Sequence, residues 1–243
     1  IEGDMRNAIT PDIGADEFDL PPNDAGIVSI LPPSIPFAAG SHPIQVVLQN
    51  QGDSTLTTAN INWEINGVAQ TAYSWSGSLL SGELDTVTLG NYVFASQVLV
   101  DFRAYTSSPN GGLDASAIND TAIVQDVTPG FGGTYTLGGV TPDFTSFTDL
   151  AYWLNLGGVY AAVQINVRDG IYDERIVFEA VPGASTSNPI IVQGENADST
   201  LVTITNSLQA SSDNYVVKFD GASWITLKHI SIASSKNYYA RCV

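Results

Sequence analysis

The sequence predicts an all-β chain in which an antiparallel β-sandwich is followed by a coil of short stacked strands. Between residues 25 and 127, alternating apolar runs are separated by turn residues, and no stretch shows helical periodicity. Beyond residue 133 the apolar runs become shorter and evenly scattered, as in coils that each bury inward residues on the preceding coil. A single helix signal, at residues 146–156, begins this second part.

Composition limits the function classes. The 243 residues carry 25 acidic and 8 basic side chains, for a net charge of −17. The negative electrostatic field of so acidic a chain argues against nucleic acid and anionic lipid as partners. The 44% of hydrophobic residues suffices for a core, and Cys242 is the only cysteine, so no disulfide forms within the chain. No run of about 18 apolar residues occurs, so we expect no membrane insertion.

Residues 1–24 form the first predicted segment, which ends in a linker. The linker Asp19-Leu20-Pro21-Pro22-Asn23-Asp24 is polar and holds two adjacent prolines. Proline fixes φ and removes an amide donor, so regular structure ends there.

Residues 25–128 form the predicted sandwich of about seven strands. Asn66-Gly67 is the dipeptide that favours a two-residue hairpin, and Trp63 alternates with Ile61 and Ile65 toward a core. The apolar runs that predict strands are 44–48, 61–65, 84–89, 98–105 and 121–124.

Residues 129–243 form the third segment, in which residues 130–133 are expected to act as a glycine-rich hinge. Ser146 is a predicted N-cap with Asp149 three residues on, and Gly157-Gly158 ends the helix. Short strands are expected at 134–137, 163–167, 176–178, 190–192, 202–204, 216–219, 225–227 and 230–232. The helix would cover the first coil, whose apolar end and strand edges need a cap.

The middle segment resembles the CARDB-type immunoglobulin-like domains, cell-adhesion-related modules of bacterial surface proteins. The residues that carry the resemblance are Asn50-Gln51-Gly52, Ile65-Asn66-Gly67-Val68 and Asn119-Asp120-Thr121, and the match covers about residues 25–127. The resemblance implies an immunoglobulin-like sandwich that acts as a spacer and contact module.

The third segment resembles the start of a right-handed parallel β-helix of the pectate-lyase-like kind. Residues 166–174, 190–196 and 215–222 carry this resemblance. Residues 3–17 resemble the segments that close such β-helices in large secreted proteins of Bacteroidetes-like bacteria. Together the resemblances imply a bacterial extracellular or cell-surface protein, in which a β-helix ends, a spacer follows, and a second β-helix begins and is truncated.

Two carboxylate clusters are candidates for Ca²⁺, which takes six to eight oxygen ligands. One is Asp12, Asp16 and Glu17; the other is Asp169, Asp173 and Glu174. Neither has the spacing of a known calcium loop. The alternative is that both are solvated turns, the first belonging to the closing coil. No other cofactor is expected.

Four aromatic residues are candidates for stacking on a sugar: Tyr73, Trp75, Tyr238 and Tyr239. The alternative for each is packing, which is the usual role of aromatic side chains in sandwiches.

No catalytic constellation is found in the sequence. Asp173 and Glu174 are adjacent, so on a strand they point to opposite faces and do not flank one glycosidic bond. We therefore expect a non-enzymatic extracellular structural or adhesion segment that contacts polysaccharide or another cell-surface component. One alternative is a fragment of a β-helix polysaccharide lyase or hydrolase whose active coils lie outside this chain. The other is a carbohydrate-binding accessory module.

Overall fold

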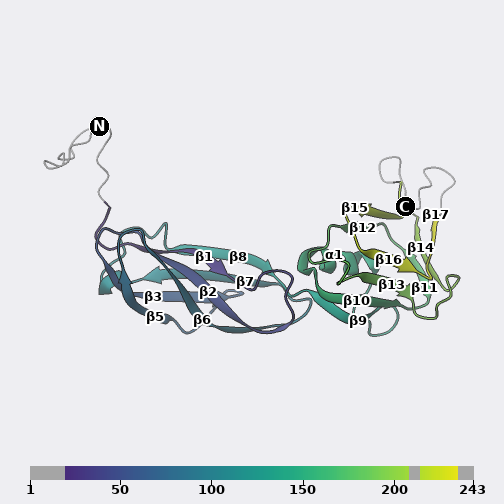
Figure 1. The fold of residues 1–243 in the computed structure, drawn as a ribbon, viewed down its shortest axis with the longest axis horizontal. Helices are drawn as coiled ribbons and strands as arrows, with labels where there is room; N and C mark the ends of the chain where they lie inside the picture. Colours follow the sequence, from purple (N-terminus) through teal and green to yellow (C-terminus); the bar gives the residue numbers. More distant parts are fainter. Residues whose placement is uncertain (1–19, 208–213, 235–243) are drawn as a thin grey trace, which may run out of the picture. The chain divides into compact units, whose positions relative to one another are not determined.

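The computed structural model describes residues 20–207 and 214–234 (Figure 1). Contacts divide the described chain into two compact units. The sandwich unit comprises residues 20–32, 43–90 and 100–125; the C-terminal unit comprises residues 33–42, 91–99 and those from 126 onward. Strands dominate both units, which confirms the all-β class.

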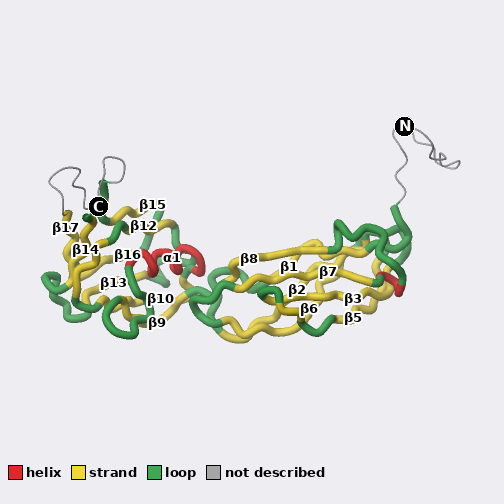
Figure 2. The backbone as a smooth tube through the Cα atoms, turned by 180° about the vertical axis from the view of Figure 1, so that it is seen from behind, coloured by secondary structure: helices red, strands yellow, loops and turns green. Residues whose placement is uncertain are grey.

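The sandwich unit is built on two sheets (Figures 1 and 2). One has the order β1-β2-β6, and the other has the order β4-β3-β7-β8 with β5 paired to β3. The strands are β1 (Ala25–Leu31), β2 (Gly40–Asn50), β3 (Leu56–Ile65), β4 (Val68–Ala69), β5 (Tyr73–Leu79), β6 (Leu84–Phe94), β7 (Val100–Ser107) and β8 (Thr121–Val127), and a 3-10 turn, η1, spans Pro109–Gly111. The pairs β1–β2, β3–β4, β3–β5 and β3–β7 are antiparallel.

Alternation along these strands places the sandwich core. In β3, Ile61, Trp63 and Ile65 are buried, while the residues between them are less so. The predicted hairpin at Asn66-Gly67 is confirmed, because Ile65 pairs with Val68 across it.

The C-terminal unit contains one α-helix and nine strands among its described residues. They are β9 (Phe131–Leu137), α1 (Phe147–Gly157), β10 (Val159–Val167), β11 (Gly170–Asp173), β12 (Ile176–Glu179), β13 (Ile190–Gly194), β14 (Val202–Asn206), β15 (Val217–Asp220), β16 (Ile225–Lys228) and β17 (Ser231–Ser234). Three sheets result, with the orders β16-β13-β10-β9, β11-β14-β17 and β12-β15 (Figure 2).

All registered strand pairs in these three sheets are parallel. Each strand from β10 to β14 pairs with the third strand after it, so successive strands belong to different sheets and the pattern then repeats. Ile165, Val192 and Leu227 share one register row, and the first two are fully buried. The expectation of stacked short strands is confirmed; the right-handed β-helix remains a prediction.

Helix α1 has the predicted boundaries. The Ser146 side chain accepts a hydrogen bond from the Asp149 amide at 3.0 Å, and Gly158 follows the helix at φ 69°, where a side chain would be strained. Phe147, Leu150, Ala151 and Leu154 form its buried face.

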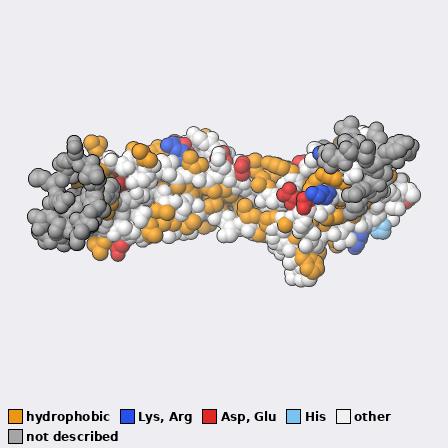
Figure 3. All heavy atoms as spheres, turned by 90° about the horizontal axis from the view of Figure 1, so that it is seen from above, with side chains coloured by type: hydrophobic (Ala, Val, Ile, Leu, Met, Phe, Trp, Pro, Cys, Tyr) orange, Lys and Arg blue, Asp and Glu red, His pale blue; other side chains and the backbone are white. Residues whose placement is uncertain are grey.

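The glycine-rich hinge predicted at residues 130–133 is wrong. Phe131 is buried at the start of β9, which pairs with β10 in parallel. A Cβ on Gly130 would lie 2.6 Å from the carbonyl oxygen of Gly157, so this glycine serves a close backbone approach. On the face shown in Figure 3, charged side chains are few and scattered among hydrophobic and uncharged ones.

Candidate metal centre

Part of the predicted sites lies outside the described residues. These are the calcium candidates Asp12, Asp16 and Glu17 and the aromatic candidates Tyr238 and Tyr239. The other candidates can be placed.

Trp75 is not a stacking platform. Its side chain is buried in β5, and the indole Nε1 donates a hydrogen bond to Asp85 Oδ2 at 2.7 Å. Gly77 allows this packing, since a Cβ there would lie 2.5 Å from the indole ring. The prediction is wrong for Trp75 because β5 is paired along β3 and turns this ring inward. Tyr73, two residues earlier, is exposed.

The second predicted carboxylate cluster does not converge. Asp169 accepts hydrogen bonds from Asn196 Nδ2, and Asp173 accepts them from the amide and hydroxyl of Ser207. These bonds from Ser207 lower the pKa of Asp173. Glu174 instead accepts from helix α1, at the amides of Phe147 and Thr148. The three carboxylates are therefore held by different partners and do not converge on one point.

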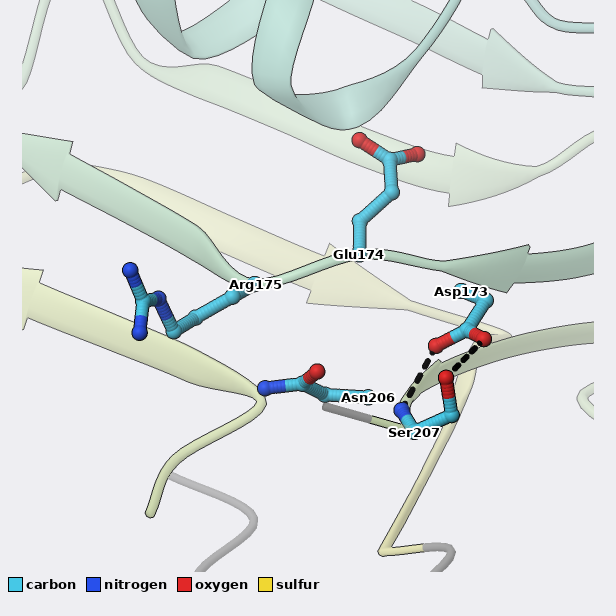
Figure 4. A pocket seen from close by; sticks show the side chains of 5 residues that line it. All are labelled: Asp173, Glu174, Arg175, Asn206 and Ser207. Atoms are coloured by element: carbon cyan, nitrogen blue, oxygen red, sulfur yellow. Dashed lines mark hydrogen bonds between the residues drawn. The ribbon is translucent and has the colours of Figure 1, made fainter. Parts of the chain in front are cut away.

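A hollow of about 300 Å³ lies beside these residues, lined by Asp173, Glu174, Arg175, Asn206 and Ser207 (Figure 4). Figure 4 shows the Glu174 carboxylate turned toward the helix, Asp173 turned toward Ser207, and the Arg175 guanidinium on the opposite side. Arg175 lies over the ring of Tyr215, 5.5 Å from its centroid. The charged groups among the described residues that line the hollow therefore point in different directions.

A different set of carboxylates converges in the sandwich unit. Asp24 directly precedes β1, Asp120 directly precedes β8, and Asp114 lies in the loop between η1 and β8. The Ile27 amide donates to the Asp120 carbonyl oxygen at 3.1 Å, which holds the starts of β1 and β8 together. One carboxylate oxygen from each aspartate lies within 4.8 Å of the others. We call these three residues the acidic cluster.

Hydrogen bonds position the acidic cluster. Asp114 accepts from the Ala25 amide at 3.3 Å and from the Ser116 amide at 3.1 Å. Asn119 Nδ2 donates to Asp24 Oδ2 at 3.2 Å. Three other buried oxygens have no hydrogen-bond partner: Oδ1 of Asp24, of Asn119 and of Asp120.

The electrostatics of the acidic cluster disfavour three charges. The pKa of Asp120 is raised from 3.8 to about 6, first by burial and then by the negative charges of Asp114 and Asp24. Burial also raises the pKa of Asp24. Among the described residues of the sandwich unit, the only basic side chain is Arg103, which pairs with Glu64 at 3.1 Å. No basic side chain of these residues therefore neutralises the acidic cluster.

The acidic cluster fits a hard divalent cation. Oxygens on opposite sides of a Ca²⁺ ion, each about 2.3–2.6 Å from it, are about 4.6–5.2 Å apart. The limit of 4.8 Å between the ligand atoms therefore allows a single ion to reach all three. Carboxylate oxygens suit Ca²⁺ or Mg²⁺, whereas zinc and copper sites favour nitrogen and sulfur.

Sequence reasoning missed the acidic cluster. Asp24 lies in the predicted linker, Asp120 lies in a segment that carries the CARDB resemblance, and Asp114 is not among the predicted site residues. Ninety residues separate Asp24 from Asp114, so only the docking of β1 beside β8 brings them together. The local signal was Asn119-Asp120 before a strand, which indicates a turn as readily as a ligand pair.

Comparisons with known proteins concern the fold. No protein-family model matches the chain, and no curated protein matches its sequence. The CARDB domain of a Pyrococcus furiosus protein, crystallised in complex with di-metal ions, is 18% identical, with a TM-score of 0.38, over 46% of this chain and 97% of that domain. Its solution structure matches at 17% identity and a TM-score of 0.36, over 45% of this chain and 97% of the domain.

A third similar structure is a domain from a Methanosarcina acetivorans protein that is named as a cell surface protein. It is 16% identical, with a TM-score of 0.37, over 44% of this chain and 92% of that domain. CARDB domains thus match a little under half of the chain. Within residues 20–207 and 214–234, no helix is long and apolar enough to cross a membrane.

Proposed function

We propose that the chain is a non-enzymatic structural segment of a surface-associated, extracellular protein. In it, an immunoglobulin-like sandwich that holds a divalent cation, Ca²⁺, serves as a spacer before a right-handed parallel β-helix. The observation that carries the proposal is the recurrence of parallel pairing at every third strand from β10 onward. Such repetition builds a rigid rod in which each coil contacts only its neighbours.

The packing of the coils supports a structural role. Inward side chains of β10, β13 and β14 are fully buried, among them Ile165, Val192 and Ile204. Helix α1 covers this core with Phe147, Leu150 and Leu154, each fully buried. The apolar end is therefore closed, as a stable solenoid requires.

The charged side chains around the hollow and on β15 are engaged by other groups of the protein, which supports a non-enzymatic role. Asp173 and Glu174 each accept two or more hydrogen bonds from the protein itself. Lys218, on β15, pairs with Asp220 at 2.6 Å, which raises the pKa of the lysine. A general base needs a pKa near the working pH, and the raised pKa of this lysine lies farther from that pH.

The proposed partner is a polysaccharide, or another component of a cell surface, that lies along the coils. Outward side chains of β10 and β13 include two amides in register: Asn166 lies beside Gln193, whose Nε2 donates to Asn166 Oδ1 at 3.3 Å. Neighbouring amides on a sheet suit hydroxyl groups of an extended glycan.

The test incubates the full chain with pectin, alginate and neutral glycans, and records both ultraviolet absorbance and retention on the immobilised glycans. We expect no unsaturated product. Absorbance that rises with the protein would favour the lyase fragment and overturn the proposal. Retention that survives loss of the amides, in an Asn166→Ala and Gln193→Ala variant, would exclude this face as the glycan contact. Retention by the sandwich alone would favour the accessory-module alternative.

A further inference from the structure

The acidic cluster has buried oxygens to which residues 20–207 and 214–234 donate no hydrogen bond. We infer that Asp24, Asp114 and Asp120, together with the side-chain oxygen of Asn119, bind one Ca²⁺ ion that clasps the linker to the loop at residues 112–120. This inference rests on the proposed function only in taking the cation as part of the sandwich. It names the ligands and what the ion holds together.

Burial is the first reason. The exposed fraction is 4% for Asp24 and 8% for Asp120, and Oδ1 of each has no partner. Removing a carboxylate from water without a compensating partner costs several kcal/mol, so buried carboxylates are paired or bind metals. The orphaned oxygen of Asn119 belongs to the same set. A cation among them supplies the missing partner for all.

The ligands come from two separate stretches of chain, the linker and the loop at residues 112–120. Asp24 ends the linker, and its carbonyl oxygen accepts the amides of Gln51 at 2.9 Å and Gly52 at 3.0 Å. Asp114 and Asp120 stand at the two sides of the loop. The Ala115 amide donates to the Asn23 carbonyl at 3.1 Å, so the loop already touches the linker. An ion held in common ties these stretches at one end of the sandwich.

The ligand chemistry favours Ca²⁺ over other cations. All donors are oxygens, three of them in carboxylates that can bind through one or both atoms. With water they reach the six to eight ligands of Ca²⁺ in an irregular arrangement, whereas Mg²⁺ demands a near-octahedral one. Three carboxylates leave a net charge of −1 around a divalent ion. Affinities of extracellular Ca²⁺ modules, about 0.1–1 mM, set the expected range.

The loop depends on such ligation for its order. Leu113 is 94% exposed and Ile118 is 96% exposed, so its two large aliphatic side chains add almost no packing. What fixes the loop is polar: the amides of Ser116 and Ala25 on the Asp114 carboxylate, and Asn119 on Asp24. Segments with little buried apolar surface open easily, and ligation of Asp114 and Asp120 opposes that opening.

The test uses the full chain freed of metal with EDTA and dialysed. Calorimetric titration with Ca²⁺ is expected to show one site with a Kd of about 0.1–1 mM. Ca²⁺ at ten times Kd is expected to raise the Tm of the sandwich by about 3–8 °C. Asp24→Asn and Asp120→Asn are each expected to weaken binding tenfold or more. The matched control Asp53→Asn removes an exposed carboxylate of the same unit and is expected to keep the affinity within twofold.

Hydrogen exchange provides a readout in the unaltered protein. Ca²⁺ is expected to slow exchange at the amides of Ala25, Ala115 and Ser116, and to leave β10 and β13 unchanged. No binding and no change in exchange at 10 mM Ca²⁺ would overturn the inference. Unchanged affinity in both aspartate variants would also overturn it, and would direct attention to other carboxylates. A Mg²⁺ affinity equal to that for Ca²⁺ would contradict the choice of ion.

The two proposals fail separately. Loss of the Ca²⁺ site leaves the parallel coils and the absence of lyase activity untouched. A lyase product would overturn the structural segment and leave the Ca²⁺ titration as it stands.

Discussion

Glu174 holds Thr148 at the first turn of helix α1 through two hydrogen bonds. Its Oε2 accepts from the Thr148 amide and from the Thr148 hydroxyl, both at 2.8 Å, while Oε1 accepts from the Phe147 amide at 3.2 Å. The first amides of a helix have no partner within the helix, and its positive end favours an anion. Glu174 follows β11, so this contact anchors the covering helix to the first coil.

Replacing Glu174 with alanine is therefore expected to destabilise the C-terminal unit by about 1–2 kcal/mol, the usual cost of losing a helix cap. Urea unfolding followed by the fluorescence of Trp153, which lies on α1, measures the change. Glu179→Ala removes an exposed carboxylate from neighbouring β12 and is expected to change stability by less than about 0.5 kcal/mol. Equal effects of the two substitutions would contradict a capping role.

The acidic cluster predicts an unusual dependence of stability on pH in EDTA. The pKa of Asp120 is raised to about 6 by burial and by the neighbouring Asp114 and Asp24, so the folded state binds its proton more tightly than the unfolded state. The contribution of this proton to the stability of the folded state is therefore complete below pH about 4 and is lost as pH rises to about 6. Other carboxylates act oppositely, so the informative quantity is the difference in Tm between Asp120→Asn and the unaltered chain.

In EDTA, the Tm of Asp120→Asn is expected to rise relative to that of the unaltered chain from pH 4 to pH 6, because the amide carries no charge at either pH. Saturating Ca²⁺ is expected to reverse the sign of this difference at pH 7, since the ion stabilises only the carboxylate. A difference that does not vary with pH in EDTA would mean that Asp120 titrates normally.

Trp75 is expected to matter for stability and not for glycan binding. Trp75→Ala removes a buried indole and is expected to cost about 3–5 kcal/mol. Trp75→Phe keeps most of the ring volume and loses the hydrogen bond to Asp85, which is exposed and can be rehydrated, so a cost of about 1–2 kcal/mol is expected. Tyr73→Ala, which removes an exposed ring two residues away, is the control and should stay within about 1 kcal/mol. Guanidinium unfolding measures all three.

The elements that could be predicted from sequence are those with local signals. Ser146 and Gly158 fix the ends of α1 through side-chain and backbone chemistry of adjacent residues, and Asn66-Gly67 fixes a hairpin in the same way. β1 was missed because the run Ala25–Leu31 follows prolines and mixes small and large residues. Trp75 alternates with Ser74 and Ser76, a pattern that indicates an inward-facing ring, so the packing alternative given for this residue is the one that its burial supports.

The site was less predictable than the fold because its residues meet only through tertiary structure. Asp173 and Glu174 are adjacent in sequence and yet serve different partners, Ser207 and helix α1. Asp24 and Asp120 are far apart in sequence and yet converge, because β1 and β8 start at the same end of the sandwich. Sequence proximity of carboxylates thus misled in one unit, and sequence separation concealed a cluster in the other.

Stacking of the coils predicts opposite outcomes for two neighbouring residues of β13. Val192 is fully buried between Ile165 and Leu227 in its register row, whereas Ile191 is only partly buried and lies between Gln164 and Thr226. Val192→Thr places a hydroxyl where no partner is expected and should cost about 1–3 kcal/mol. Ile191→Thr continues a polar row and should cost less than about 1 kcal/mol. Urea unfolding of the C-terminal unit compares them. A larger cost at Ile191 would mean that the coils bury the opposite face of β13, which the parallel register does not allow.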